Sequence, residues 1–175
     1  PNNLKRGDIM PLLPVPYLGR LPYLAVCHTP ADWPAVWPML EQLAGAGLRL
    51  WYDWSGDNSL DNAQERAARL QKAGMVLLCI SDAFLQQETM RELLCTVTTS
   101  GRPAAAVFLS PLTLELPAAR LHLSALPQMP LSELEAPGVL PDWITSLTGG
   151  GALHRKWPER KPELLSLDEQ QGGSK

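Results

Sequence analysis

The sequence lacks a long hydrophobic run and lacks an excess of basic charge. No apolar segment approaches the roughly 18 residues that a membrane-spanning helix needs. The formal net charge is −3 and the pI is near 5.6, whereas a surface that follows nucleic-acid phosphates usually needs a basic excess. The main basic stretch, His154-Arg155-Lys156, has acidic residues close behind it and reads as part of a solvated tail. We therefore expect neither a membrane partner nor a nucleic-acid partner.

Cysteine is also scarce, with three residues in the chain. They are widely spaced, and no Cys-x-x-Cys or Cys/His ligand spacing occurs, so we expect no zinc site and no other metal site. Cys27 and Cys79 lie inside apolar runs, which is typical of buried free thiols in a reducing compartment. We accordingly expect a cytoplasmic location.

The remaining composition is that of one folded domain. The chain has 175 residues, of which 45% are hydrophobic and 19% charged. Residues 1–22 are rich in proline, including Pro11, Pro14, Pro16 and Pro22, which predicts an extended lead-in. Residues 23–148 form the expected domain, and residues 149–175 read as a polar and loosely structured tail. A chain that begins with Pro1 is expected to be a piece of a longer protein.

Short apolar runs alternate with helical patterns along the expected domain. The runs predict strands, and the spacing of apolar residues between them predicts helices. Asp32 is expected to cap the first helix, with Pro34 in its first turn. Four strands are predicted at residues 24–27, 48–52, 75–80 and 104–109, with helical segments near 32–44, 61–73 and 89–98.

The pattern weakens after the fourth strand. Residues 112–123 alternate only partly and predict an irregular excursion. Residues 126–131 are a candidate fifth strand, which Pro127 and Pro130 would confine to a sheet edge or a bulge. Residues 141–147 read as a last short helix.

This order predicts an α/β fold of the flavodoxin-like kind, in which helices cover both faces of a mostly parallel sheet of about five strands. Ligands of such sheets bind beyond the carboxyl ends of the strands. The polar residues at those ends are Cys27-His28, Asp53 and Ser81. The chain has no Gly-x-Gly-x-x-Gly after the first strand, which argues against a dinucleotide-binding Rossmann fold. It also lacks the acidic pair that a receiver domain would carry there.

Four stretches, with the strands and helices in this order and with similar residues at their ends, resemble TIR (Toll/interleukin-1 receptor) domains of the bacterial type. They are Leu24 to Asp32, Val36 to Leu40 continuing to Gly47 to Asp53, Ile80-Ser81-Asp82-Ala83-Phe84-Leu85, and Arg91-Glu92-Leu93. The resemblance covers roughly residues 20–147. In the family the corresponding strands end in a Trp-Tyr-Asp sequence and an Ile-Ser-x-x-Tyr-Leu sequence, which this chain matches closely at 51–53 and 80–85.

The resemblance implies chemistry as well as a fold. Many TIR domains cleave NAD between nicotinamide and ribose as part of immune-type signalling. Their catalytic residue is one glutamate at the start of the third helix. That residue corresponds by position to Glu92, with Glu88 as the alternative carboxylate. A carboxylate can stabilise the positive charge that develops on the ribose. NAD is then a substrate, and no cofactor is implied.

Substrate-contacting positions are expected at the strand ends, namely Cys27, His28, Asp53, Trp54 and Ser81. His28 could carry a proton, and Trp54 could stack on a base or pack against another subunit. The family also implies self-association through TIR–TIR contacts, which usually gates activity, and contacts with other signalling proteins.

An interaction module that has lost activity is the alternative to the enzyme. Three departures from the family pattern favour it: Cys27 and His28 replace a serine and a tyrosine, and the loop after Asp53 lacks its usual proline.

Overall fold

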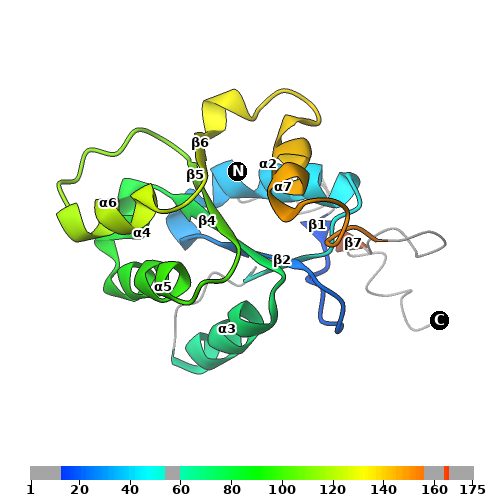
Figure 1. Cartoon of the computed structure of the whole chain (residues 1–175), viewed down its shortest axis with the longest axis horizontal. Helices are drawn as coiled ribbons and strands as arrows, with labels where there is room; N and C mark the ends of the chain where they lie inside the picture. The colour runs from blue at the N-terminus through cyan, green and yellow to red at the C-terminus, as the bar shows by residue number, and fades with distance from the viewer. Residues whose placement is uncertain (1–12, 54–59, 156–163, 166–175) are drawn as a thin grey trace, which may run out of the picture.

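The computed structural model describes residues 13–53, 60–155 and 164–165. A five-stranded, all-parallel sheet forms its centre (Figure 1). The strands, in spatial order, are β3 (Leu50–Tyr52), β2 (Leu24–Cys27), β4 (Met75–Ile80), β5 (Ala104–Phe108) and β6 (Gln128–Pro130). This order, in which the first central strand lies between the second and the third, is that of flavodoxin-like sheets. The predicted fold class is therefore confirmed.

The middle of the sheet is buried on both faces, as its apolar sequence predicts. Every residue of β4 is buried. Its register places Val76 beside Ala25 of β2 and beside Ala104 of β5. The predicted edge strand is confirmed as β6, which among the described strands pairs with β5 alone and carries Pro130 at its end. An edge tolerates proline because one side of the strand donates no ladder hydrogen bond.

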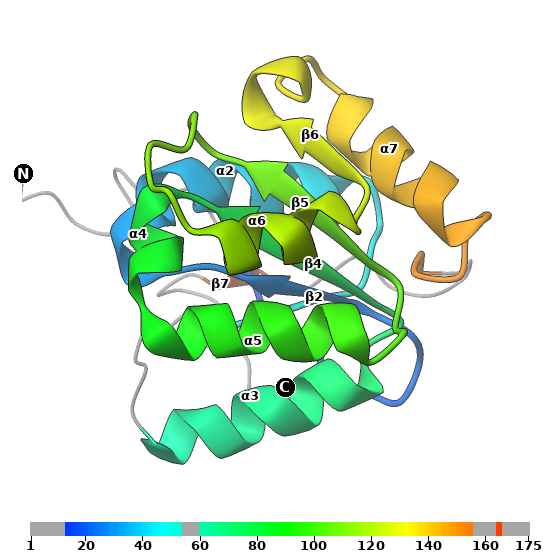
Figure 2. The ribbon, with the colours of Figure 1, turned by 60° about the vertical axis from the view of Figure 1, so that its left-hand side comes forward.

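Helices cover the two faces of the sheet and complete three layers (Figure 2). On one face, α2 (Trp33–Gly45) and α7 (Val139–Thr148) pack on Leu24, Val26 and Leu77. The other face carries α3 (Leu60–Lys72), α4 (Asp82–Gln86), α5 (Glu88–Thr99) and α6 (Pro117–Ser124). Each face thus has its own apolar core.

Two helices differ from the sequence prediction. The segment between β4 and α5 forms α4, which Ser81 caps by accepting a hydrogen bond from the backbone N–H of Phe84. The prediction of an irregular excursion at 112–123 is wrong in its second half, where α6 begins at Pro117. Proline fits the first turn of a helix. Ala119 and Leu123 of this helix are buried, so tertiary packing stabilises a segment with little helical periodicity.

Parts of the lead-in and of the tail pack on the domain. Strand β1 (Leu13–Pro14) pairs antiparallel with β7 (Leu164–Leu165). The backbone N–H of Tyr17 donates to the Leu50 carbonyl at 2.6 Å, along the edge of the sheet beside β3. Leu153 is 2% exposed and belongs to the core under α2 and α7.

Candidate functional site

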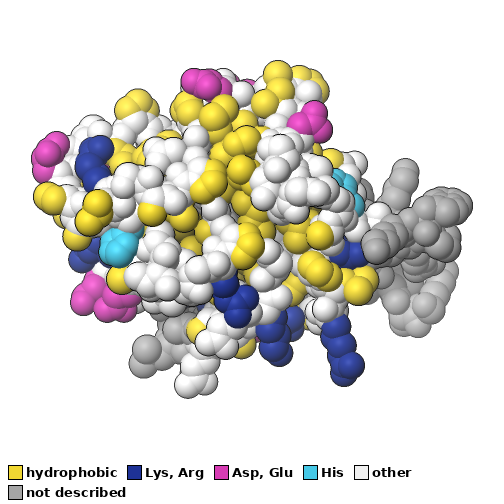
Figure 3. Space-filling view, in the orientation of Figure 1, with side chains coloured by type: hydrophobic (Ala, Val, Ile, Leu, Met, Phe, Trp, Pro, Cys, Tyr) yellow, Lys and Arg dark blue, Asp and Glu magenta, His cyan; other side chains and the backbone are white. Residues whose placement is uncertain are grey.

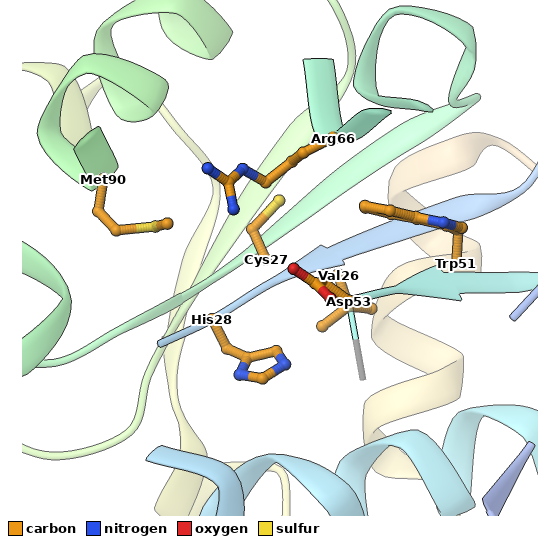
Figure 4. A pocket seen from close by; sticks show the side chains of 7 residues that line it. All are labelled: Val26, Cys27, His28, Trp51, Asp53, Arg66 and Met90. Atoms are coloured by element: carbon orange, nitrogen blue, oxygen red, sulfur yellow. The ribbon is translucent and has the colours of Figure 1, made fainter. Parts of the chain in front are cut away.

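The carboxyl end of β2 places two adjacent side chains on opposite faces of the sheet. Cys27 lies among the apolar residues under α3 and α5, and the His28 ring points away from it (Figure 4). Cys27 is 4% exposed, and burial raises the pKa of its thiol to about 12, although the charge of Arg66 opposes this shift. The thiol is therefore protonated at neutral pH and is a poor nucleophile.

His28 is held as a buried, neutral ring. Its Nδ1–H donates to the Thr29 carbonyl at 2.9 Å, and its ring packs against Trp33 with centroids 5.4 Å apart. Burial lowers the pKa of this imidazole, and the Thr29 carbonyl together with the nearby Asp53 and Asp32 only partly opposes the shift. Within the described residues Nε2 has no hydrogen-bond partner of good geometry.

Ser81 and Thr29 are joined through one carboxylate. The Ser81 hydroxyl donates to Oδ2 of Asp32 at 2.5 Å, and the Thr29 hydroxyl donates to the same oxygen at 3.0 Å. Asp32 occupies the position before α2 but makes no side-chain capping hydrogen bond. The expected capping role of Asp32 is thus wrong, because its carboxylate ties the exit of β2 to the exit of β4 instead. The Ser81 hydroxyl, engaged here and in capping α4, serves the fold.

A small cavity, which we call the strand-tip pocket, lies beside β2 and β3. It brings together three of the predicted site residues, Cys27, His28 and Asp53, with Arg66 of α3 (Figure 4). Its volume is about 10 Å³, which is room for about one water molecule. The pocket as described is too small for a nucleotide. Trp54, the other predicted contact in this region, lies outside the described residues.

Glu92 lies on a second, larger cavity, the α3–α5 groove, whose volume is about 300 Å³. Glu92 is exposed on α5, and its neighbours in the groove include Thr89 one turn earlier. Glu88 is exposed but lines neither cavity. Glu92 and the three strand-end residues Cys27, His28 and Asp53 therefore line different cavities, and Ser81 lines neither. Arg66 lines both of them and connects the two.

The α3–α5 groove is lined from α3 by one small side chain, that of Ala67, among larger ones. Figure 2 shows the two helices side by side on one face of the sheet. Ala67 and Arg66 form part of the rim, and Leu70 is the described α3 side chain that reaches the core. An alanine at the contact leaves space that a larger apolar residue would fill. The floor is apolar, with Leu70, Val76 and Val97, whereas Arg66, Glu92 and Arg102 are charged.

This combination can bind a small amphipathic ligand. Ligand pockets typically have volumes of about 300–1,000 Å³, with apolar walls and a few polar groups. The sequence predicted Glu92 but missed Arg66. In the sequence Arg66 stands in a run of charged and alanine residues, where nothing separates a solvated arginine from one that lines a cavity.

The part of the chain that the structure describes holds neither a membrane-spanning helix nor a metal-binding cluster. No helix there is both long and apolar enough to cross a membrane. No cluster of three or more His, Cys, Asp or Glu residues there is arranged to hold a metal ion. Comparison with known proteins gave no family model that matches the chain and no curated protein with significant similarity.

Proposed function

We propose that this chain is a TIR-type enzyme that cleaves NAD at the bond between nicotinamide and ribose, with Glu92 as the catalytic residue. The observation that carries the proposal is the position of Glu92 on a groove of about 300 Å³, whose rim also carries Arg66. An exposed glutamate on a featureless helix face would have no substrate to act on. Here the carboxylate faces a cavity with an apolar floor and a cation beside it.

The proposed chemistry is a displacement at the anomeric carbon of the nicotinamide ribose. The C–N bond breaks, and nicotinamide leaves with the bonding electron pair. Positive charge develops on the ribose, where the Glu92 carboxylate stabilises it. A water molecule adds its oxygen to the anomeric carbon and passes a proton to Glu92. The products are nicotinamide, ADP-ribose and one proton.

Self-association is part of this proposal. The strand-tip pocket alone has no room for a nucleotide, and the α3–α5 groove is open to solvent along its charged rim. A neighbouring copy placed over the groove would exclude water and strengthen the electrostatic effect of Glu92. Activity should then rise with protein concentration more steeply than in direct proportion.

The test is incubation of the protein with NAD, first dilute and then concentrated or crowded, with nicotinamide release measured by chromatography. Glu92→Gln should lower the rate by about 100-fold or more, because a general catalyst contributes about that much. Glu88→Gln is the matched control, since this glutamate lies one turn earlier on α5 and lines neither cavity. Equal loss in both variants, or full activity in Glu92→Gln, would contradict the proposal.

A second candidate, a module that binds a partner without catalysis, is favoured by one specific observation. The Ser81 hydroxyl, an expected substrate contact, donates to Asp32, which also accepts from Thr29. These polar groups at the ends of β2 and β4 therefore bind one another instead of a substrate. No NAD turnover at any concentration, together with a stable complex with itself or another protein, would support this candidate.

A further inference from the structure

Arg66 has an unusual position for a helix arginine. It is half-buried and lines both the strand-tip pocket and the α3–α5 groove. In Figure 4 its guanidinium points toward Cys27 and Met90, and its charge is close enough to Cys27 to oppose the rise in the thiol's pKa. The cation therefore lies at the junction of the two cavities.

The charges around the groove favour an anion at this junction. Two arginines, Arg66 and Arg102, face one carboxylate, Glu92. Arg66 and Thr89 lie toward the N-terminal end of α5, whereas Arg102 follows its C-terminal end. The N-terminus of a helix carries partial positive charge and the C-terminus partial negative charge. The helix thus reinforces Arg66 and weakens Arg102 as an anion-binding group. Asp53 is the acidic side chain that lines the strand-tip pocket together with Arg66, and its charge opposes the binding of an anion there.

We infer that Arg66 binds the diphosphate of a dinucleotide ligand lying in the α3–α5 groove. A guanidinium offers paired N–H donors that match phosphate oxygens, which gives geometric selectivity as well as charge. The rest of the ligand lies over the apolar floor of Leu70 and Val97. The site therefore selects ligands that carry a diphosphate over ligands that carry none. The identity of the ligand rests on the proposed function, but the role of Arg66 is tested separately from catalysis.

The experiment measures binding of ADP-ribose by calorimetry, since this ligand keeps the diphosphate and lacks the bond to be cleaved. Arg66→Gln should weaken binding at least tenfold, and Arg66→Lys should weaken it less because the charge remains. Lys72→Gln is the matched control, a loss of the same charge at an exposed position of α3 that lines neither cavity. It should bind ADP-ribose as the unsubstituted protein does. Circular dichroism of each variant checks that the fold is kept.

Two further measurements separate the diphosphate contact from a general structural effect. Adenosine, which has no phosphate, should bind the unsubstituted protein and Arg66→Gln equally weakly. If NAD is cleaved, Arg66→Gln should raise KM about tenfold and change kcat by less than about threefold, because the contact is made before and during the reaction alike. A fall in kcat with unchanged KM would overturn the inference.

The inference and the proposed function fail in different ways. Without NAD cleavage, but with ADP-ribose binding that depends on Arg66, the inference holds and the catalytic proposal fails. Equal binding of ADP-ribose to the unsubstituted protein and Arg66→Gln would overturn the inference even if NAD is cleaved. The absence of ADP-ribose binding to the unsubstituted protein would overturn the inference as well.

Discussion

At the scale of single residues, His28 shows how burial changes the chemistry of a side chain that proton transfer could otherwise use. Its Nδ1–H donates to the Thr29 carbonyl. Burial holds the pKa below its usual range. The sequence placed His28 correctly at the end of a strand, but only the packing around it shows that the neutral ring is the form the fold requires.

The pH dependence of stability tests this conclusion. The His28 pKa is lower in the folded protein than in the unfolded chain, where it is about 6.5. The unfolded chain therefore binds more protons below that pH, and the free energy of unfolding falls as the pH drops through this window. The variant His28→Phe keeps an aromatic ring against Trp33 but has no group that titrates. In this variant the part of the decrease in the free energy of unfolding that His28 causes should disappear. Urea unfolding at several pH values between 7.5 and 5 measures it.

The control is His122→Gln, which removes a partly exposed histidine that contacts Thr98 from α6. His28 is unchanged in this variant, so the part of the loss that is assigned to His28 should remain. Parallel curves for His28→Phe and the unsubstituted protein would show that other groups, such as carboxylates, cause the whole loss.

At the scale of elements, the pair α3 and α5 decides where a ligand can bind. Sequence periodicity predicted both helices, and the structure confirms them. It could not predict the space between them, because that space depends on how far apart the two helices settle on the sheet. Ala67 is exposed on α3 and lines the groove. A weakly apolar helix face gives little packing force, so the groove remains open.

Ala67→Leu should fill this space. The new side chain adds apolar contact between α3 and α5 and should raise the free energy of unfolding by about 1 kcal/mol. It should also weaken ADP-ribose binding at least tenfold by occupying the groove. Ala68→Leu is the control, since Ala68 is exposed on the same helix and does not line the groove. Unchanged binding in Ala67→Leu, measured by calorimetry, would place the ligand elsewhere.

At the scale of the whole molecule, one buried arginine joins segments from both ends of the described chain. Arg49 is 1% exposed, and its Nη1 donates to the Pro22 carbonyl at 2.8 Å and to the Ala152 carbonyl at 3.1 Å. Its guanidinium also lies 6.0 Å from the centroid of the Tyr17 ring. The lead-in and the start of the tail are thus parts of the folded unit, although their composition suggests flexible segments.

Arg49→Leu should lower the free energy of unfolding by about 3 kcal/mol, because two carbonyls would lose a charged donor. Arg49→Lys keeps the charge but cannot reach both carbonyls equally well, so its loss should be smaller. Arg20→Leu, at an exposed position, should change stability by less than about 0.5 kcal/mol. Denaturant unfolding measures all three. An Arg49→Leu value close to that of Arg20→Leu would contradict a joining role for Arg49.

The face shown in Figure 3 carries both apolar and charged side chains. Hydrophobic side chains occupy the middle of that face, and several Lys and Arg side chains lie along its lower part. The overall charge is nevertheless slightly negative, at −3. A local cationic region on an acidic protein is compatible with binding a small anionic ligand rather than a polyanion.

The sequence by itself determined the class of fold, because short apolar runs such as Met75–Ile80 that alternate with helical patterns are typical of the inner strands of a parallel sheet, with helices covering both of its faces. It also determined the polar residues at the strand ends. Only the tertiary structure decided what those residues do. Asp32 binds Ser81 from 49 positions away, and Arg66 joins two cavities built from separate helices and strands. Such contacts depend on distances between elements, which periodicity along the chain does not encode.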